Sequence, residues 1–510
     1  MAVIDQRVLG LRATFAGMKI AMLVILAMGC GGRASSPAPP PSGAAGFPAA
    51  RWVPATPTYV FSSQTLGDAQ HSLRDAIDVL GTVAGYDLGD AAHGVEDLLG
   101  IDALDADPLA AIGVDLHASW AMFSDALNPT LVVRLAAPDH MRAFLDRQRA
   151  RGLVTRSVID NTEVSSATLA GGVRISWAID GDWMWVHFAL PFAPEDDTRW
   201  FTASHGPHED AWSSNWAWAQ HAAGAAAGLV GVLDLHGTIA RAVARIPDAV
   251  ACAKLVEPVG RVAMAVEGDD HHVVTRIAID VGSTAGIRSM FLPAPAGWDA
   301  VAAHAAIAAQ WNLDITALRS WLAPCLATAG SRLTLFDETS VRAARGMVLD
   351  FDPGSMSGSG AVALDLTNAA YIEHQLDQIP LRRTLSRART FGAYHGVSIS
   401  IPFSVTIEYV LDPRWVIAAL GEGLLTKLVT SGAPGGAGAP PLIALDVVPP
   451  AMSAEAWGVA LHVLAEQSFS GSPGPATRRW VERLMRWRDV HLAVTAVSTA
   501  LVVTASANRR

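Results

Sequence analysis

Hydrophobic and polar residues alternate most strictly over residues 173–188, VRISWAIDGDWMWVHF. Successive side chains of a strand point to opposite faces, and Asp-Gly is typical of a two-residue type I′ turn, so the pattern predicts a β-hairpin that turns at Asp180-Gly181. One face would carry Val173, Ile175, Trp177, Met184, Val186 and Phe188, and the other Arg174, Ser176, Ala178, Trp183, Trp185 and His187. Because the first set is apolar throughout, we expect it to face the core.

A second alternating segment, residues 262–281, predicts another hairpin. Its sequence, VAMAVEGDDHHVVTRIAIDV, places acidic residues and His271-His272 at the tip. Helical patterns are separated from these hairpins along the chain. Antiparallel hairpins combined with segregated helices predict the α+β class rather than a doubly wound parallel sheet.

Several blocks of sequence recur in the same order in the two halves of the chain. LVVRLAAPDHMRAFLDRQ (131–148) matches VALDLTNAAYIEHQLDQI (362–379), GGVRISW (171–177) matches HGVSISI (395–401), and VLDL (232–235) matches ALDV (444–447). These matches set Gly172 opposite Gly396 and Asp234 opposite Asp446. They predict a tandem duplication of an antiparallel-sheet-plus-helices unit, with repeats over 57–295 and 296–510.

Composition narrows the classes of function. The chain has 510 residues, of which 51% are hydrophobic and 17% charged, and its formal net charge is −11. These values support large buried cores, and the acidic balance argues against a nucleic-acid partner. The lysines of the body, Lys254 and Lys427, are each followed by Leu, so neither lies in a P-loop motif.

The N-terminal residues have the pattern of an export signal. Arg7, Arg12 and Lys19 precede an apolar run over residues 20–28, which is too short to span a bilayer. Residues 1–29 are therefore predicted to be a signal peptide, and Met18 is an alternative start, because MKIAMLVIL is a complete short signal by itself.

The end of this run, Met28-Gly29-Cys30, followed by CGGRASSPAPPPSG, resembles the lipobox and flexible tether of bacterial lipoproteins. Ala27 stands where that family usually has Leu. The resemblance implies cleavage before Cys30, acylation of Cys30, and a Pro/Ser/Gly/Ala-rich tether over residues 30–56. Gly31, where retained inner-membrane lipoproteins often carry Asp, implies the outer membrane. The rest of the chain loosely resembles exported bacterial repeat proteins of unknown function.

If Cys30 is lipidated, Cys252 and Cys325 remain. An oxidising compartment favours a disulfide between them, and two separate buried thiols are the alternative.

No sequence motif clearly indicates a metal site or a catalytic nucleophile. SHGPHED (204–210) groups His205, His208, Glu209 and Asp210 as zinc-type ligands, but Pro207 and the loop setting favour a solvated loop. GSMSG (354–358) has Met356 where a nucleophile elbow has Ser. We therefore assign no catalytic residue, metal site or cofactor, and lean against an enzyme.

Tryptophan is unusually dense between residues 183 and 218. Tryptophan side chains most often lie in the buried core, and they are also common in binding surfaces. In the second interpretation, Trp183 and Trp185 line a ligand groove that a helix carrying Trp212 and Trp216 partly covers. Full docking of that helix, with no groove, is the alternative that we favour.

The sequence thus predicts a lipid-anchored protein of the cell envelope with a non-catalytic binding or scaffolding role. Its expected partners are the membrane, through the N-terminal lipid, and either an envelope protein or a hydrophobic ligand. Two other functions stay open: an exported hydrolase whose active site is dispersed in sequence, and a carrier of a hydrophobic ligand in the Trp-lined groove.

Overall fold

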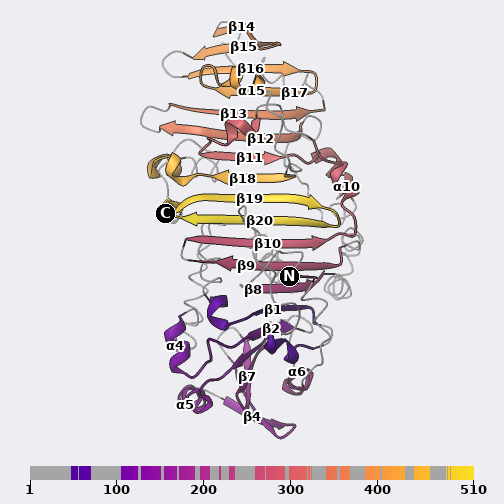
Figure 1. The fold of residues 1–510 in the computed structure, drawn as a ribbon, viewed down its shortest axis with the longest axis vertical. Helices are drawn as coiled ribbons and strands as arrows, with labels where there is room; N and C mark the ends of the chain where they lie inside the picture. The colour runs from indigo at the N-terminus through magenta and orange to yellow at the C-terminus, as the bar shows by residue number, and fades with distance from the viewer. Residues whose placement is uncertain are drawn as a thin grey trace, which may run out of the picture. The chain divides into compact units, whose positions relative to one another are not determined.

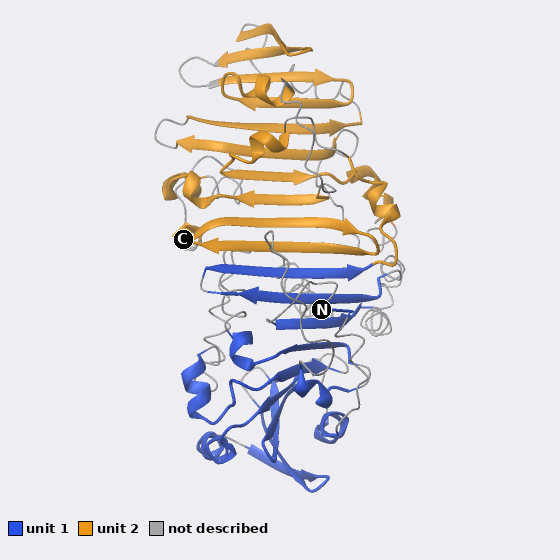
Figure 2. Ribbon diagram, viewed as in Figure 1, with its two compact units in different colours: residues 1–29, 33–242, 259–280 blue, residues 30–32, 243–258, 281–510 orange. Residues whose placement is uncertain are grey.

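The computed structural model describes residues 47–54, 57–70, 105–124, 128–150, 154–168, 172–189, 196–206, 218–219, 229–235, 259–269, 271–292, 298–318, 320–321, 323, 341–352, 357–367, 385–401, 405–430, 441–459, 478, 481–482 and 484–510. The described residues form two compact units: those up to Asp280 belong to unit 1, and those from Val281 belong to unit 2 (Figure 2). In these residues no helix is long and apolar enough to cross a membrane.

Unit 1 is built on an antiparallel sheet (Figure 1). Its strands are β1 (Tyr59–Ser63), β2 (Trp120–Ser124), β3 (Thr130–Arg134), β4 (Val154–Ile159), β5 (Thr162–Thr168), β6 (Arg174–Asp180), β7 (Trp183–Ala189), β8 (Leu229–Asp234), β9 (Arg261–Gly268) and β10 (His272–Asp280). They lie side by side in the order β4-β5-β6-β7-β3-β2-β1-β8-β9-β10. The helices are η2 (Pro48–Trp52), α4 (Ala106–Ala111), α5 (Pro138–Arg149) and α6 (Asp197–Ser204).

Unit 2 also has an antiparallel sheet. Its strands are β11 (Ile307–Trp311), β12 (Val341–Asp352), β13 (Ser357–Leu366), β14 (Ser386–Phe391), β15 (Tyr394–Ile401), β16 (Val405–Asp412), β17 (Trp415–Leu420), β18 (Ile443–Val447), β19 (Trp487–Val497) and β20 (Ala500–Arg509). Their order is β14-β15-β16-β17-β13-β12-β11-β18-β19-β20. The helices are α10 (Ala285–Arg288), α11 (Trp298–Ala302), α15 (Leu424–Thr430) and η5 (Pro449–Ala451).

The two strand orders are the same when β1 is set against β11 and each later strand against its counterpart. The prediction of an α+β class is nevertheless wrong, because the structure is mainly antiparallel sheet. The paired strands β12 and β13 have twelve and ten residues, whereas the described helices α10, α11 and α15 have four, five and seven.

The shared strand order also corrects part of the sequence alignment. Gly172 lies just before β6, but Gly396 lies in β15, whereas the counterpart of β6 is β16. The match of GGVRISW with HGVSISI is therefore wrong by one strand. In contrast, Asp234 and Asp446 lie in the counterpart strands β8 and β18.

The β6–β7 hairpin has the predicted faces but a different turn. Asp180 pairs with Trp183, so Gly181 and Asp182 form the turn, and only Gly181 has a positive φ (57°). The prediction of a type I′ turn at Asp180-Gly181 is thus wrong by one residue. The cross-strand pairing consequently shifts by two residues, which leaves each side chain on its expected face. The second predicted hairpin, β9–β10, is confirmed.

Both faces of the β6–β7 hairpin are buried. On the first face Ile175, Trp177 and Met184 are buried, while Val186 and Phe188 are partly exposed. On the second face Arg174 is partly exposed, while Ser176, Ala178, Trp183, Trp185 and His187 are all 8% exposed or less. The core of this region therefore includes the face that carries polar residues.

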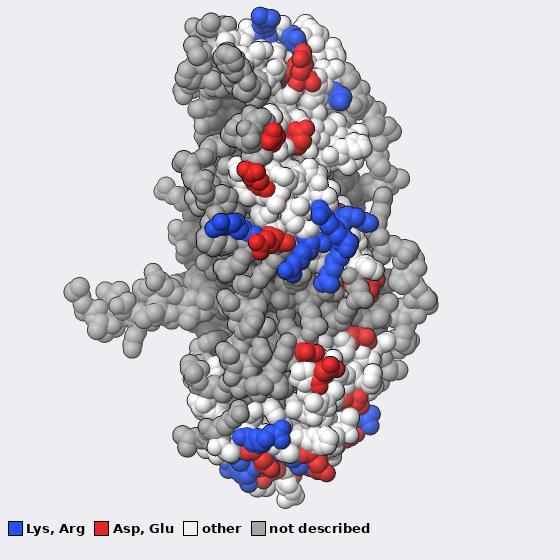
Figure 3. All heavy atoms as spheres, turned by 90° about the vertical axis from the view of Figure 1, so that its left-hand side faces the viewer, with Lys and Arg blue, Asp and Glu red and all other residues white. Residues whose placement is uncertain are grey.

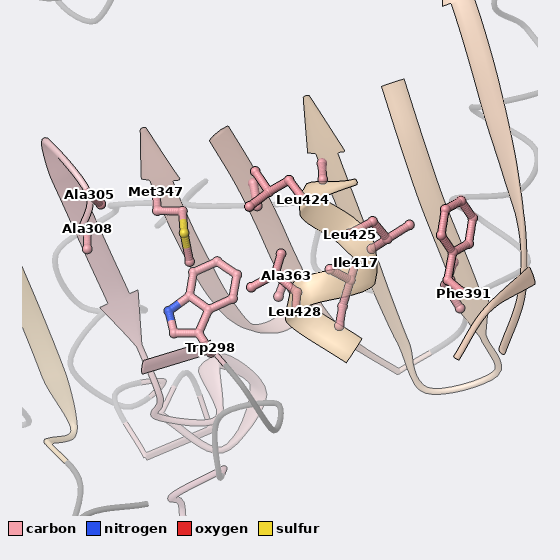
Figure 4. Packing of buried hydrophobic residues seen from close by; sticks show 13 residues of the cluster. Trp298, Ala305, Ala308, Met347, Ala363, Phe391, Ile417, Leu424, Leu425 and Leu428 are labelled. Carbon is pink, nitrogen blue, oxygen red and sulfur yellow. The ribbon is translucent and has the colours of Figure 1, made fainter. Parts of the chain in front are cut away.

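The core of unit 2 forms where α15 packs on the sheet (Figure 4). Leu424, Leu425 and Leu428 of α15 are buried in the same cluster as Ile417 of β17 and Trp298 of α11. The spacing of these leucines gives α15 one apolar side, which explains why so short a helix is stable there.

Ion pairs cover the surface of unit 1 around α5 and the β4–β5 hairpin. Arg149 lies 2.7 Å from Asp146 and 3.4 Å from Glu163, and Arg156 is also 3.4 Å from Glu163. Figure 3 shows acidic and basic side chains side by side at the lower end of the view. Exposed pairs of this kind contribute little to stability, but they prevent a patch of one sign.

Candidate functional site

The densest group of buried polar side chains in unit 1 surrounds Asp197 at the start of α6. Asp196 caps this helix by accepting a hydrogen bond from the Thr198 amide (3.1 Å). This cap turns Asp197 toward strands β5 and β6, where Ser166 and Ser176 lie directly opposite each other. The helix start and two neighbouring strands therefore meet at one carboxylate.

Both oxygens of Asp197 accept two hydrogen bonds each. Ser176 Oγ (2.6 Å) and Trp200 Nε1 (3.2 Å) donate to Oδ1. Ser166 Oγ (2.8 Å) and the Arg174 guanidinium donate to Oδ2. The side chain of Asp197 is 10% exposed and that of Arg174 is 38% exposed, so the ion pair reaches from the interior to solvent.

This environment keeps Asp197 ionised. Burial by itself would raise the pKa of Asp197, but hydrogen bonds from Ser176, Ser166 and Trp200, together with the charge of Arg174, lower the pKa below its ordinary value. A carboxylate with a low pKa and four donors has little basicity left for proton abstraction. The arrangement is suited to fixing α6 on the sheet rather than to acid–base catalysis.

His187 lies beside this group and stacks on one of its members, Trp200. Its Nδ1 is 2.9 Å from Thr130 Oγ1, and its ring stacks on Trp200 with a centroid distance of 4.9 Å and an angle of 3°. Ser176 is the cross-strand partner of His187, but the Ser176 hydroxyl donates to Asp197. A nucleophilic triad needs histidine between serine and aspartate, so these three residues do not form one.

Trp183 and Trp185, which one of the two interpretations of the sequence placed along a ligand groove, are covered by η2. Trp52 of η2 makes edge-on contacts with Trp183 (5.7 Å) and Trp185 (5.1 Å). The Arg51 guanidinium lies over the rings of Trp52 (4.6 Å) and Trp183 (5.1 Å). The segment that covers these tryptophans therefore belongs to residues 30–56, which the sequence indicated to be tether, and not to the expected helix with Trp212 and Trp216.

The other residues singled out in the sequence are mostly outside the described part of the chain. These are Cys30, Cys252, Cys325, Trp212, Trp216, His208, Glu209 and Asp210. His205 is described: its Nε2 is 3.0 Å from Asp180 Oδ2, and its ring stacks on Phe201 at 4.4 Å. The described residues hold no group of three or more His, Cys, Asp or Glu side chains that could bind a metal.

Unit 2 contains a row of three residues with the chemistry of a hydrolase. Asp446, His491 and Ser506 are direct cross-strand neighbours on β18, β19 and β20, and His491 Nδ1 contacts Asp446 Oδ1. However, Ser506 is fully buried, its hydroxyl has no hydrogen-bond partner among the described residues, and His491 Nε2 points to Asp489 (3.9 Å). The row lacks the serine–histidine bond that nucleophilic catalysis requires.

Sequence reasoning missed the Asp197 group. The acidic pair before TRWF is a recognisable helix start, and Ser176 and Arg174 were already assigned to one strand face. No local signal, however, indicates that this helix start lies over β5 and β6.

Comparisons with known proteins do not identify a family. No family model matches the chain, and no curated protein matches it. Solved structures that resemble it include crystal form III of TP0453 (9% identity, TM-score 0.25) and crystal form I (8% identity, TM-score 0.27), each match covering 46% of this chain and 79% of the other. At these TM-scores the likeness carries no argument about fold or function.

Proposed function

We propose that the chain is a lipid-anchored protein of the cell envelope, held at the outer membrane through Cys30, with a non-catalytic binding or scaffolding role. The proposed lipid anchor is supported by the order of the N-terminal residues: a basic segment, a short apolar run, Cys30 and a Pro/Ser/Gly/Ala-rich stretch.

The position of η2 is compatible with such an anchor. The first described residue, Phe47, is 17 residues after Cys30 and is already buried in unit 1. A fully extended chain spans at most about 3.3–3.6 Å per residue, so the lipid would lie no further than about 60 Å from Phe47. The anchor would therefore keep unit 1 near the membrane while leaving it free to meet partners.

The non-catalytic role is supported by the chemistry of the two polar groups. The oxygens of Asp197 are occupied by donors that fix α6, and the buried hydroxyl of Ser506 makes no hydrogen bond to any described residue. Neither group has the arrangement that nucleophilic attack requires.

The anchor is tested by Cys30→Ser expressed in a Gram-negative host. We expect the wild-type chain to incorporate radiolabelled palmitate and to remain in the membrane fraction after carbonate washing, because acyl chains bury many CH₂ groups at about 0.8 kcal/mol each. The variant is expected to lose the label and become soluble. Ser35→Ala, in the same stretch, is the matched control. Retention of unlabelled Cys30→Ser in the washed membranes would refute the proposal.

A further inference from the structure

Strand β14 (Ser386–Phe391) forms one edge of the sheet described for unit 2 (Figure 1). Among the described residues it pairs only with β15, and its four central positions are all exposed. An edge strand carries a row of backbone N–H and C=O groups that can pair with another chain. The direction of these groups and the nearby charges therefore decide which chain the edge would accept.

The register of the β14–β15 hairpin determines which backbone groups face outward. Phe391 pairs with Tyr394 across a two-residue turn, and the residues that flank such a turn are hydrogen-bonded to each other. Hydrogen-bonded and non-hydrogen-bonded pairs alternate along an antiparallel ladder, so Arg389 and Arg387 direct their N–H and C=O groups to β15. The outward-facing groups belong to the residues between them, which are Ser386, Ala388 and Thr390.

The two arginines of β14 stand on the same face of the strand, because they are two positions apart. The Arg389 guanidinium lies 3.2 Å from the buried Glu408 and 3.6 Å from Glu422, so its charge is partly balanced. Arg387 is exposed and forms no hydrogen bond or ion pair with the described part of the chain. The edge therefore offers an unpaired guanidinium beside its outward backbone groups.

The edge strand of unit 1, β4, differs from β14 in its charge. Its four central positions are also exposed, and Val158 among them is 74% exposed. Its arginine, Arg156, however, lies 3.4 Å from Glu163 of the neighbouring strand β5. An edge whose charge is already paired within the sheet gains less from an acidic partner, so β4 is the natural internal comparison for β14.

We propose that β14 binds an extended acidic segment of a protein partner, which adds to the sheet as a further strand. The proposal rests on the binding role argued above and deepens it by naming the surface and the chemistry of the partner. Carboxylates at alternate positions of the added strand face Arg387 and Arg389 together. A second copy of β14 is an unfavourable partner, because antiparallel pairing centred on Ala388 sets Arg387 of one copy opposite Arg389 of the other.

The first test titrates a fluorescently labelled peptide of eight residues, in which Thr and Glu alternate, against the full chain in a mild detergent. Its glutamates share one face of a strand. The matched control is a peptide of the same composition in which the glutamates come in adjacent pairs, so that no two of them are two positions apart. We expect the alternating peptide to bind at least about fivefold more tightly, because only its carboxylates can meet both arginines at once.

Two substitutions in β14 separate backbone pairing from charge, and circular dichroism checks that each variant folds. Ala388→Pro removes an outward N–H group and no bond to β15, so the sheet should tolerate it, whereas peptide binding should weaken at least about tenfold. Arg387→Glu replaces attraction by repulsion and should weaken binding at least about fivefold. Val158→Pro, at an outward position of β4, is the matched control and should leave peptide binding unchanged.

The outcomes that contradict the proposal are distinct from a failure of the lipid anchor, because the peptide titration is the same whether or not Cys30 carries lipid. No binding of the alternating peptide, or equal binding of the two peptides, would overturn the proposal. Loss of binding in Arg387→Glu but not in folded Ala388→Pro would indicate a charged surface without strand addition and would also overturn it. Phosphatidylglycerol vesicles that bind the Cys30→Ser chain through Arg387, without any peptide binding, would identify a membrane contact instead.

Discussion

Removal of the Asp197 carboxylate is the sharpest test of how unit 1 is held together. Asp197→Ala leaves Arg174 without its counter-ion and leaves Ser166, Ser176 and Trp200 without their shared acceptor. Because Arg174 is 38% exposed and can be hydrated, the loss comes mainly from the three buried donors that are left without an acceptor, and should be about 3–5 kcal/mol in total. Asp197→Asn keeps an acceptor oxygen but loses the charge, so we expect a smaller loss of about 1–3 kcal/mol.

The pH dependence of this loss follows from the sign of the pKa shift. The pKa of Asp197 is lower in the folded chain than in the unfolded chain, where it is about 3.9. Its contribution to stability is therefore fully present above about pH 4 and disappears as the pH falls through the folded pKa. The difference in stability between wild type and Asp197→Asn should shrink over that acidic range.

Urea unfolding of the soluble Cys30→Ser chain, followed by circular dichroism and by hydrogen exchange, measures these effects. We expect the amides of α6, β5 and β6 to lose protection, while those of unit 2 do not change. The matched control is Asp146→Ala on α5, whose side chain is 64% exposed and whose ion pair should contribute less than about 1 kcal/mol. If Asp197→Ala costs no more than Asp146→Ala, the argument from hydrogen bonding is refuted.

Three further changes test other parts of the fold. Gly231→Ala would place its Cβ 2.4 Å from ring atoms of Phe61, so we expect urea unfolding to show a loss of about 1–3 kcal/mol in stability. Adding Phe61→Ala should restore part of this loss. An unchanged urea midpoint would contradict the register of β1 and β8. The hydrogen bond and charge of Asp446 raise the pKa of His491. This pair therefore stabilises the folded chain below about pH 6.5, and the stabilisation is lost as the pH rises through the folded pKa of His491. Asp446→Asn should lower the pKa of His491 in an NMR titration and should destabilise the chain more at pH 6 than at pH 9. Trp183→Ala removes a side chain that is 8% exposed and should cost about 3–5 kcal/mol, whereas a loss below about 1 kcal/mol would show that Trp52 of η2 does not pack on it.

The sequence by itself determined which residues of the β6–β7 hairpin share a face. Alternation with a period of two assigns faces correctly even when the turn is misplaced by one residue, as happened at Asp180-Gly181, because the cross-strand pairing then shifts by two residues. The same reasoning located the β9–β10 hairpin. It failed for the match of Gly172 with Gly396, because short apolar blocks fit more than one strand of a long antiparallel sheet.

Only the tertiary structure decided what covers each face. The sequence left open whether the face that carries Ser176 and His187 is covered or forms a groove, and in the structure α6 and η2 bury that face. Helix η2 comes from residues whose Pro- and Ala-rich surroundings resembled a tether, and α6 brings the carboxylate that accepts a hydrogen bond from Ser176. Such contacts join residues far apart in the chain, and burial is a property of the packed surfaces, so no local pattern could specify them.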